Sequence, residues 1–108
     1  MKKSQDYIGR ALDLADLVQY ADESIVSKTL LEKKHGTLTL FAFDKGQGLS
    51  EHTSPYDATV CVLDGQATLI IGGERINASA GEMVIMPANV PHDVQAEDRF
   101  KMLLIMIR

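Results

Sequence analysis

With 108 residues, a net charge of −4 and 45% hydrophobic residues, the chain has the size and composition of one globular domain and not of a disordered segment. The acidic balance makes a nucleic acid an unexpected partner, and no apolar run approaches the roughly 18 residues of a membrane-spanning helix. We therefore expect neither nucleic acid nor membrane as its partner. Because the single cysteine, Cys61, cannot form an internal disulfide, we also expect a cytoplasmic protein held together by core packing.

A lead-in over residues 1–23 is predicted to precede a run of short strands. Within the lead-in, residues 11–18 have apolar spacing that fits a short helical turn better than a strand. From residue 24 onward, apolar and β-branched runs bounded by glycine or charged turns predict strands. These runs cover residues 25–31, 37–43, 58–63, 67–71, 75–78, 83–86, 92–96 and 99–107. About eight or nine strands at this spacing indicate an all-β sandwich or barrel, so we expect a single domain over 1–108 with its barrel in 24–108.

The last predicted strand, residues 99–107, is apolar on both faces. Its alternating side chains are Phe100, Met102, Leu104 and Met106 on one face and Leu103, Ile105 and Ile107 on the other. A half-exposed antiparallel strand alternates apolar with polar residues, so a covering element is needed on each side. In so short a chain we expect that cover to be a second copy, in a homodimer that buries Leu103, Ile105 or Ile107.

Two blocks of sequence place a histidine at a fixed distance from glycine or proline. The matching residues are Gly46, His52 and Gly65 in the first block, and Gly81, Pro87 and His92 in the second. Together the blocks resemble the two signature motifs of the cupin superfamily, and the resemblance extends from about residue 38 to the C-terminus. It implies a cupin-type jelly-roll barrel (a double-stranded β-helix) of antiparallel strands, in agreement with the predicted strand count.

The resemblance also implies a metal site with an incomplete set of ligands. The family motifs supply a His-x-His pair, a glutamate and a distant histidine, and residues i and i+2 of a strand point to one side. This sequence keeps His52 and His92, but Ser54 stands at the second histidine position and Ala58 at the glutamate position. A hydroxyl binds transition metals weakly and a methyl group not at all. The implied ligands are therefore His52 and His92, for a divalent ion whose identity among Zn, Mn, Fe and Ni stays open.

Three functions remain open at this stage. The first is a module that binds a small polar molecule, and possibly a divalent ion, through His52, Ser54, Met86 and His92. The second is a metal-dependent enzyme of cupin type, in the sugar isomerase or epimerase, decarboxylase or dioxygenase class. The third is an interaction protein that acts through its dimer surface. No catalytic residue is assigned.

Several other residues have a functional and a structural interpretation. Asp57 is either a replacement metal ligand or a turn carboxylate that accepts hydrogen bonds from nearby amides. If the corner before it turns inward, Tyr56 or Asp57 is a candidate general base. Cys61 has the opposite parity to the expected ligands and is predicted to face away from the pocket. His35 is expected to be a solvated turn residue.

The second block is also predicted to be stiff. Pro87 and Pro91 each fix a backbone angle, so the loop between them should deliver His92 in one place. Asn89 stands at the glycine position of the family's Pro-x-Gly. Four methionines are expected to fill the core or the pocket instead of forming a soft-metal site, because they come from strands of mixed parity; they are Met83, Met86, Met102 and Met106.

Overall fold

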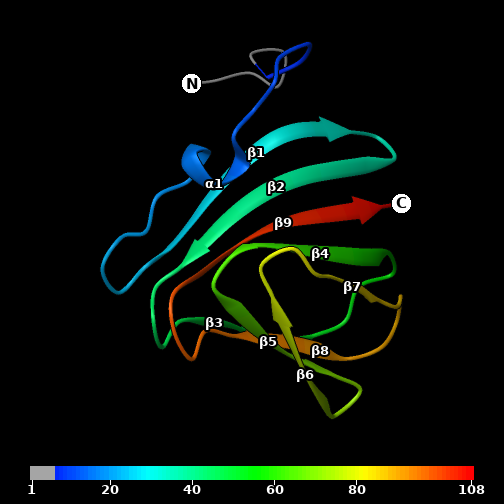
Figure 1. Cartoon of the computed structure of the whole chain (residues 1–108). Helices are drawn as coiled ribbons and strands as arrows, with labels where there is room; N and C mark the ends of the chain where they lie inside the picture. The colour runs from blue at the N-terminus through cyan, green and yellow to red at the C-terminus, as the bar shows by residue number, and fades with distance from the viewer. Residues whose placement is uncertain (1–6) are drawn as a thin grey trace.

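The computed structural model describes residues 7–108, which form two antiparallel sheets and one short helix (Figure 1). The helix is α1 (Leu14–Leu17). The strands are β1 (Ile25–Lys33), β2 (Gly36–Phe43), β3 (Gly48–His52), β4 (Asp57–Asp64), β5 (Gln66–Ile71), β6 (Glu74–Ser79), β7 (Met83–Met86), β8 (His92–Gln95) and β9 (Phe100–Ile107). The all-β jelly roll expected from the sequence is confirmed. No helix within residues 7–108 has the length and apolar character needed to cross a bilayer.

The chain alternates between the two sheets as it advances. The larger sheet has the strand order β1-β2-β9-β4-β7, and the smaller one has the order β3-β8-β5-β6. All eight predicted strands are present, and one further strand, β3, was missed. This strand, Gly48 to His52, is short and largely exposed, and Leu49 is its only apolar residue. A strand with one inward apolar side chain leaves no alternation to detect, so only its pairing with β8 reveals it.

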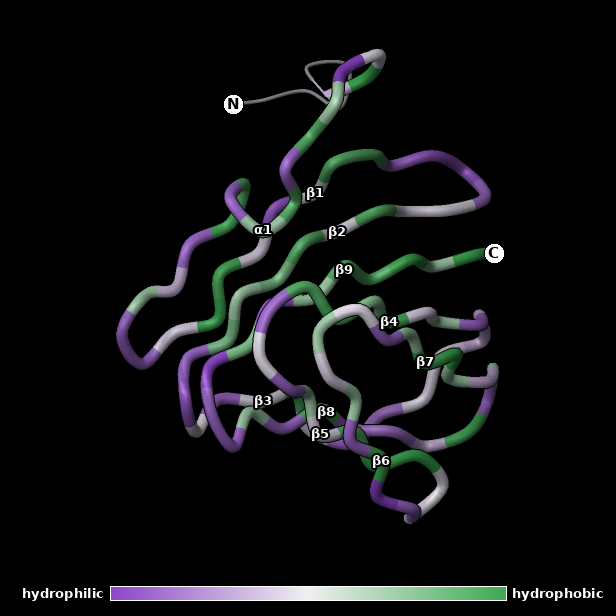
Figure 2. Tube along the Cα trace, viewed as in Figure 1, coloured by the Kyte–Doolittle hydropathy of each residue, from purple (hydrophilic) through white to green (hydrophobic). Residues whose placement is uncertain are grey.

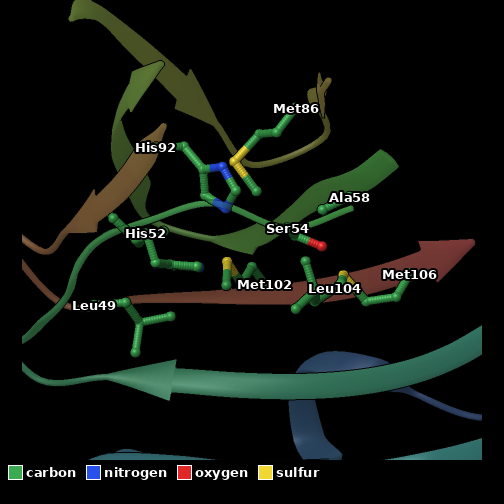
Figure 3. Close-up of a pocket in the computed structure, with 10 residues that line it drawn as sticks. Leu49, His52, Ser54, Ala58, Met86, His92, Met102, Leu104 and Met106 are labelled. Atoms are coloured by element: carbon green, nitrogen blue, oxygen red, sulfur yellow. The ribbon is translucent and has the colours of Figure 1, made fainter. Parts of the chain in front are cut away.

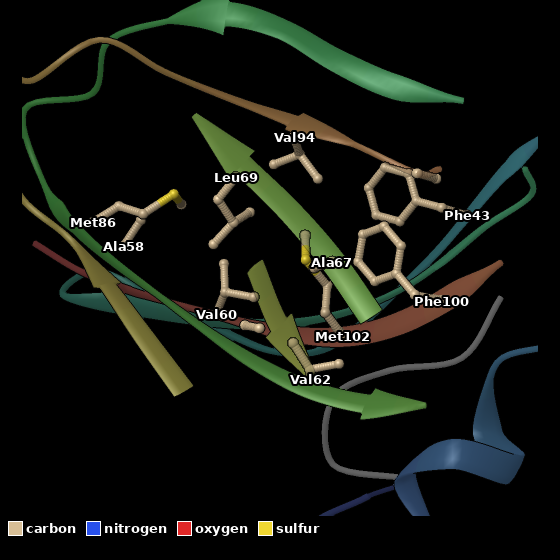
Figure 4. Close-up of a cluster of buried hydrophobic side chains, with 12 residues drawn as sticks. Phe43, Ala58, Val60, Val62, Ala67, Leu69, Met86, Val94, Phe100 and Met102 are labelled. Carbon is tan, nitrogen blue, oxygen red and sulfur yellow. The ribbon is translucent and has the colours of Figure 1, made fainter. Parts of the chain in front are cut away.

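The core lies between the facing sheets, and alternate residues of β4, β5 and β9 supply much of it (Figure 4). Along β4, Ala58, Val60 and Val62 are buried. At one end of the barrel, the rings of Phe43 and Phe100 stack with centroids 4.6 Å apart. Figure 2 shows how hydropathy varies along the chain, with hydrophobic residues along β2 and β9 and hydrophilic ones in the turn between β1 and β2. The packed aromatic end leaves the opposite end of the barrel for a cavity.

Residues that precede β1 pack on the outer face of the larger sheet. Val18 is 1% exposed and belongs to a second apolar cluster with Leu40 and Ala42 of β2. Leu103 of β9 packs against this cluster. The chain itself therefore covers part of the outer face of β9, whereas the sequence predicted a second copy there. Ile105 and Ile107 are the residues that this cover does not include.

An ionic network attaches the start of β1 to the barrel. The Arg99 Nε atom lies 2.7 Å from Asp44 Oδ1, and Arg99 Nη2 lies 3.0 Å from Asp22 Oδ1. The backbone N–H of Glu23 donates to Asp44 Oδ2 at 2.7 Å. The hydrogen bond from Arg99, followed by the one from Glu23, lowers the pKa of Asp44 from 3.8 to about 2. Asp44 thus joins the segment before β1 to the loop before β9.

Tyr20 extends this network along the outer face. Its hydroxyl donates to Asp64 Oδ2 at 2.6 Å, and its ring lies beneath the cationic groups of Arg99 and Lys101. Partial burial, together with the hydrogen bond to Asp64, raises the pKa of Tyr20 above its usual value. The ammonium of Lys101 also donates to the carbonyl of Ala15 at 2.6 Å. The buried part of the segment before β1 is therefore held by polar contacts as well as by apolar packing.

Asp44 makes the strength of this attachment depend on pH, and replacing Asp44 should remove that dependence. The folded-state pKa of Asp44 lies below its ordinary value, so its ionised form stabilises the fold above about pH 4 and loses that effect as the pH falls toward 2. We expect Asp44→Asn to be less stable than the wild type at pH 7, with the difference shrinking to nothing near pH 2. Urea denaturation across this range measures it. Asp13→Asn is a matched control, because the Asp13 side chain makes no capping hydrogen bond to α1.

The rest of the outer face stays exposed and apolar, and we propose that a second copy covers it. Met83, Ile85 and Ile107 are each about 60% exposed. Ile85 of β7 pairs with Thr59 of β4, and Ile107 of β9 pairs with Asp57, two residues earlier in β4. Contiguous apolar patches of this kind mark interaction sites. Of Leu103, Ile105 and Ile107, which the sequence predicted a dimer to bury, Ile107 belongs to this patch.

Light scattering at micromolar concentration tests the dimer. We expect a mass of twice 11.9 kDa for the wild type and a shift toward the monomer for Ile85→Lys and Ile107→Lys. Ile8→Lys serves as the control, because Ile8 is equally exposed but lies in a turn that precedes α1. A monomeric wild type would rule out this interface.

Candidate functional site

Two histidines from strands forty positions apart in sequence lie side by side in the barrel. His52 is the last residue of β3 and His92 is the first of β8, and the two are direct partners in the antiparallel register. Their ring centroids are 4.4 Å apart and the ring planes meet at 68°. His92 is only 3% exposed, whereas His52 lies at the exposed edge. The structure thus brings together the two residues that the sequence motifs singled out.

The hydrogen bonds of the two rings define which nitrogen faces the pocket. His52 Nδ1 lies 2.7 Å from the carbonyl oxygen of Ser50, and His92 Nδ1 lies 3.0 Å from that of Val90. A carbonyl oxygen can only accept, so we assign the proton of each neutral ring to Nδ1. Nε2 then carries the lone pair in both rings. The site therefore presents two imidazole acceptors with the same tautomer, each oriented by its own strand.

The loop before β8 holds His92 in place by backbone geometry. Asn89 has φ of +64°, in the left-handed region that asparagine tolerates better than most residues. This explains why asparagine can replace the glycine of the family motif. The Asn89 N–H donates to the Ser54 carbonyl at 2.7 Å, and the Ala88 N–H donates to Asp57 Oδ1 at 2.9 Å. Asp57 therefore has the turn-carboxylate role that the sequence left open, and its carboxylate holds the loop.

A cavity of about 130 Å³ opens beside the two rings (Figure 3). Its lining residues are Leu49, His52, Ser54, Ala58, Met86, His92, Val94, Met102, Leu104 and Met106. All four residues predicted to bind a ligand are among them. The sequence did not predict Leu49 as a lining residue, because it did not predict the strand β3 to which Leu49 belongs. Met102, Leu104 and Met106 share one face of the last predicted strand, so their alternation was a signal that they lie on one side.

Three of the four methionines fill the pocket as expected, and Met83 does not. Met86, Met102 and Met106 all line this cavity, and only Met83 of the four is mostly exposed. Met86 and Met102 come from different strands of the same sheet. In that sheet β7 and β9 both flank β4, so their inward faces meet over Ala58.

The divalent metal implied by the family motifs does not fit the residues present. No group of three or more histidine, cysteine, aspartate or glutamate side chains in residues 7–108 could hold an ion. Ser54 Oγ already accepts the Tyr56 N–H at 3.1 Å, and Ala58 offers only a methyl group. Structural zinc sites use four ligands, and catalytic ones usually use three plus water. With two imidazoles alone, a Zn, Mn, Fe or Ni ion would be held weakly.

The remaining candidate residues lie away from the cavity. Cys61 is half-buried on the outer side of β4, opposite Met83 and Leu103, as the parity argument predicted. His35 is an exposed turn residue. The Tyr56 ring lies under the guanidinium of Arg108, with 5.4 Å from its carbon to the ring centroid. Neither Tyr56 nor Asp57 is among the residues that line the cavity.

Comparison with known proteins identifies the class. Residues 39–108 match the Cupin domain family, so the chain belongs to the cupins. No curated protein matches the sequence. A conserved protein of unknown function from Streptococcus pyogenes has a similar structure, with a TM-score of 0.88 and 35% identity over 93% of this chain and 88% of that one.

Two further structures support the same assignment. A cupin 2 conserved barrel domain protein from Leptotrichia buccalis is 42% identical, with a TM-score of 0.87, over 90% of this chain. This chain spans 47% of that longer one. A cupin superfamily protein from Desulfitobacterium hafniense is 27% identical, with a TM-score of 0.86, over 92% of this chain and 91% of that one.

Restoring a missing ligand should restore affinity for a divalent ion. We expect Ser54→His to complete a His-x-His pair and to strengthen Zn²⁺ or Ni²⁺ binding on the order of tenfold, which corresponds to about 1.4 kcal/mol. Isothermal titration calorimetry measures the change. Thr53→His is the matched control, because Thr53 is exposed and does not line the cavity. Equal gains in both variants would show that the added imidazole acts outside the pocket.

Proposed function

We propose that this cupin is a binding module that holds a small polar molecule against His52 and His92. The observation that carries the proposal is that both imidazoles line one cavity while a backbone carbonyl oxygen occupies each Nδ1 atom, which leaves each Nε2 atom as the acceptor. Within residues 7–108 no buried polar side-chain atom lacks a hydrogen-bond partner, which agrees with Nε2 atoms that are open to the cavity instead of being sealed in the core. The ligand therefore needs a group that can donate to these acceptors, such as a hydroxyl or a protonated carboxyl.

The walls of the cavity limit the rest of the ligand. Apart from the two imidazoles and Ser54, the lining side chains are alanine, valine, leucine and methionine. Drug-sized pockets have volumes of roughly 300–1,000 Å³, and this cavity is about 130 Å³. The proposed ligand is therefore small, with one polar end that meets the imidazoles and a compact apolar remainder. Apolar walls with a few polar groups that fix the orientation of the ligand are typical of ligand sites.

A metal-dependent cupin enzyme is the less supported alternative. Isomerase or epimerase chemistry needs a general base, and neither Tyr56 nor Asp57 lines the cavity. The third alternative, an interaction protein, relies on the same outer face that we assign to the dimer. We place the binding module in the cytoplasm, because its single cysteine leaves no internal disulfide to be maintained.

Substituting the histidines tests the proposed site. In a thermal-shift screen of small hydroxylated and carboxylic metabolites, we expect hits that stabilise the wild type, by about 2.7 kcal/mol at a hundred times Kd. His52→Ala should lose this stabilisation, and because His52 is exposed the fold should tolerate it. His35→Ala is the matched control, since His35 is an exposed histidine outside the cavity.

Isotope-labelled histidine gives a second readout. A bound hydrogen-bond donor should shift the Nε2 resonances of His52 and His92 and leave that of His35 unchanged. Hits that stabilise His52→Ala and His92→Gln as well as the wild type would place binding elsewhere and overturn the proposal.

A further inference from the structure

A second hollow, which we call the outer groove, lies on the outer face of the larger sheet where β1 turns into β2. Its volume is about 300 Å³. Leu38 of β2 pairs with Leu31 of β1 on one side and with Ile105 of β9 on the other, and all three line the groove. Ile107 lies two residues further along β9 and lines it too. Apolar side chains from three adjacent strands therefore form one continuous floor.

Local features of β1 and of the turn after it keep this groove open. The register of β1 against β2 shifts between Thr29 and Leu31, so Leu30 is the extra residue of a β-bulge. Leu30 is buried in the cluster with Val18, beneath the segment before β1, whereas Leu31 lines the groove. Gly36 lines it without a side chain. The cover that the chain supplies therefore ends at Leu30, and the groove begins at the next residue.

The rim of the groove beside the turn is cationic. Lys33 lines it, and a lysine packs its methylene stem on apolar surface while its ammonium stays in water. The C-terminal end of β9 lies beside the same turn (Figure 1), where the Arg108 N–H donates to the His35 carbonyl at 2.9 Å and Arg108 Nη1 donates to the Lys33 carbonyl at 3.4 Å. Glu32 pairs with Thr37 and has the opposite parity to Lys33. Within residues 7–108, no aspartate or glutamate lines the groove.

We propose that the outer groove binds a free medium-chain fatty acid as its carboxylate. The alkyl chain lies along the row formed by Leu31, Leu38 and Ile105, and the carboxylate lies at the rim, near Lys33 and Arg108. This site is separate from the one in the proposed function, because the groove is on the outer face of the larger sheet and the histidine cavity lies between the sheets.

The chemistry of the groove selects both halves of this ligand. An apolar floor favours an alkyl chain, because each buried methylene strengthens binding about fourfold. The groove has the liquid volume of about ten water molecules, which suits a chain of medium length. A carboxylate complements the lysine and arginine at the rim, and an arginine can hold it with two parallel hydrogen bonds. A protein with a net charge of −4 presents positive charge beside an apolar surface here.

A second copy of the chain fits the groove less well than it fits the patch of Met83, Ile85 and Ile107. A twofold axis through the groove would bring the Lys33 side chains of the two copies together, and like charges that face each other oppose association. The patch lies toward β7 and the groove toward β1, with Ile107 at their border. Ile85 does not line the groove, so Ile85→Lys allows the groove to be tested without the proposed dimer.

Calorimetric titration with decanoate, kept below its micelle concentration, tests the proposal on the wild type and on Ile85→Lys. We expect one saturable site in both proteins. Octanoate should bind about fivefold or more weakly than decanoate, since it loses two methylenes. Decyltrimethylammonium has the same chain with a cationic head and should bind at least tenfold more weakly. In isoleucine methyl spectra, decanoate should shift Ile105 and Ile107 and leave Ile76 of β6 unchanged.

A pair of lysine variants tests the cationic rim. Lys33 and Lys34 are adjacent and both exposed, but only Lys33 lines the groove. We expect Lys33→Gln to weaken decanoate binding about fivefold, the upper end for an exposed ion pair. Lys34→Gln is the matched control and should change the affinity less than twofold. His52→Ala should bind decanoate like the wild type.

Four outcomes would overturn the fatty-acid proposal. Equal affinity for decanoate and decyltrimethylammonium, or equal effects of Lys33→Gln and Lys34→Gln, would show that the rim charge selects nothing. Loss of decanoate binding in His52→Ala would place the ligand in the barrel cavity. Cosedimentation with anionic phospholipid vesicles without a saturable decanoate site would indicate a membrane surface. Ile105 methyl shifts that follow protein concentration, with no decanoate binding, would indicate a second copy. The metabolite response of His52→Ala decides the proposed function separately.

Discussion

The antiparallel pairing of β3 with β8 is the constraint on which the site depends. It sets His52 opposite His92, and β8 is held on its other side by β5, where Ile71 pairs with His92. A slip of one residue in the register of a strand turns its side chains to the other face of the sheet. The pairing therefore decides whether the two imidazoles face the cavity or the solvent. It also explains the glycine at position 48, where a Cβ atom would collide with the carbonyl oxygen of Val94 in β8.

The two ends of the barrel have different contents for a physical reason. At one end, the stacked rings of Phe43 and Phe100 fill the space between the sheets. At the other end, Ala58 presents a methyl group where the family motif has a glutamate. The Ser54 hydroxyl oxygen accepts a hydrogen bond from the Tyr56 N–H in the turn before β4. Removing the charged groups leaves a cavity whose acceptors are neutral. Its affinity for a ligand then depends on hydrogen bonds and apolar contact instead of charge attraction.

The segment before β1 changes what the outer face of the larger sheet can do. Val18 and its neighbours cover β2 and part of β9, and the contacts of Arg99 with Asp44 and Asp22 hold that cover in place. The uncovered part of the face includes Ile85 and Ile107, and it extends to the outer groove lined by Leu31 and Ile105. A cover that is built into the chain thus restricts a partner on this face to the residues outside that cover. The cavity opens between the sheets, so a partner on the outer face leaves the proposed ligand site accessible.

Local pattern in the sequence determined most of the fold and the identity of the central pair. Apolar and β-branched runs bounded by turns predicted eight of the strands, and the motif spacing singled out His52 and His92. Periodicity reports only how a segment is divided between its own two faces. It could not reveal β3, whose single apolar residue needs β8 to make it a strand, nor the cover over Leu103, which comes from a distant part of the chain.

Only the tertiary structure decided what surrounds the histidines. It bound Asp57 to the Ala88 amide and brought Met86 and Met102 to one cavity. These outcomes depend on which strands become neighbours. Pairing between segments distant in sequence is set by the free energy of the whole packed barrel, and no single stretch of residues encodes it.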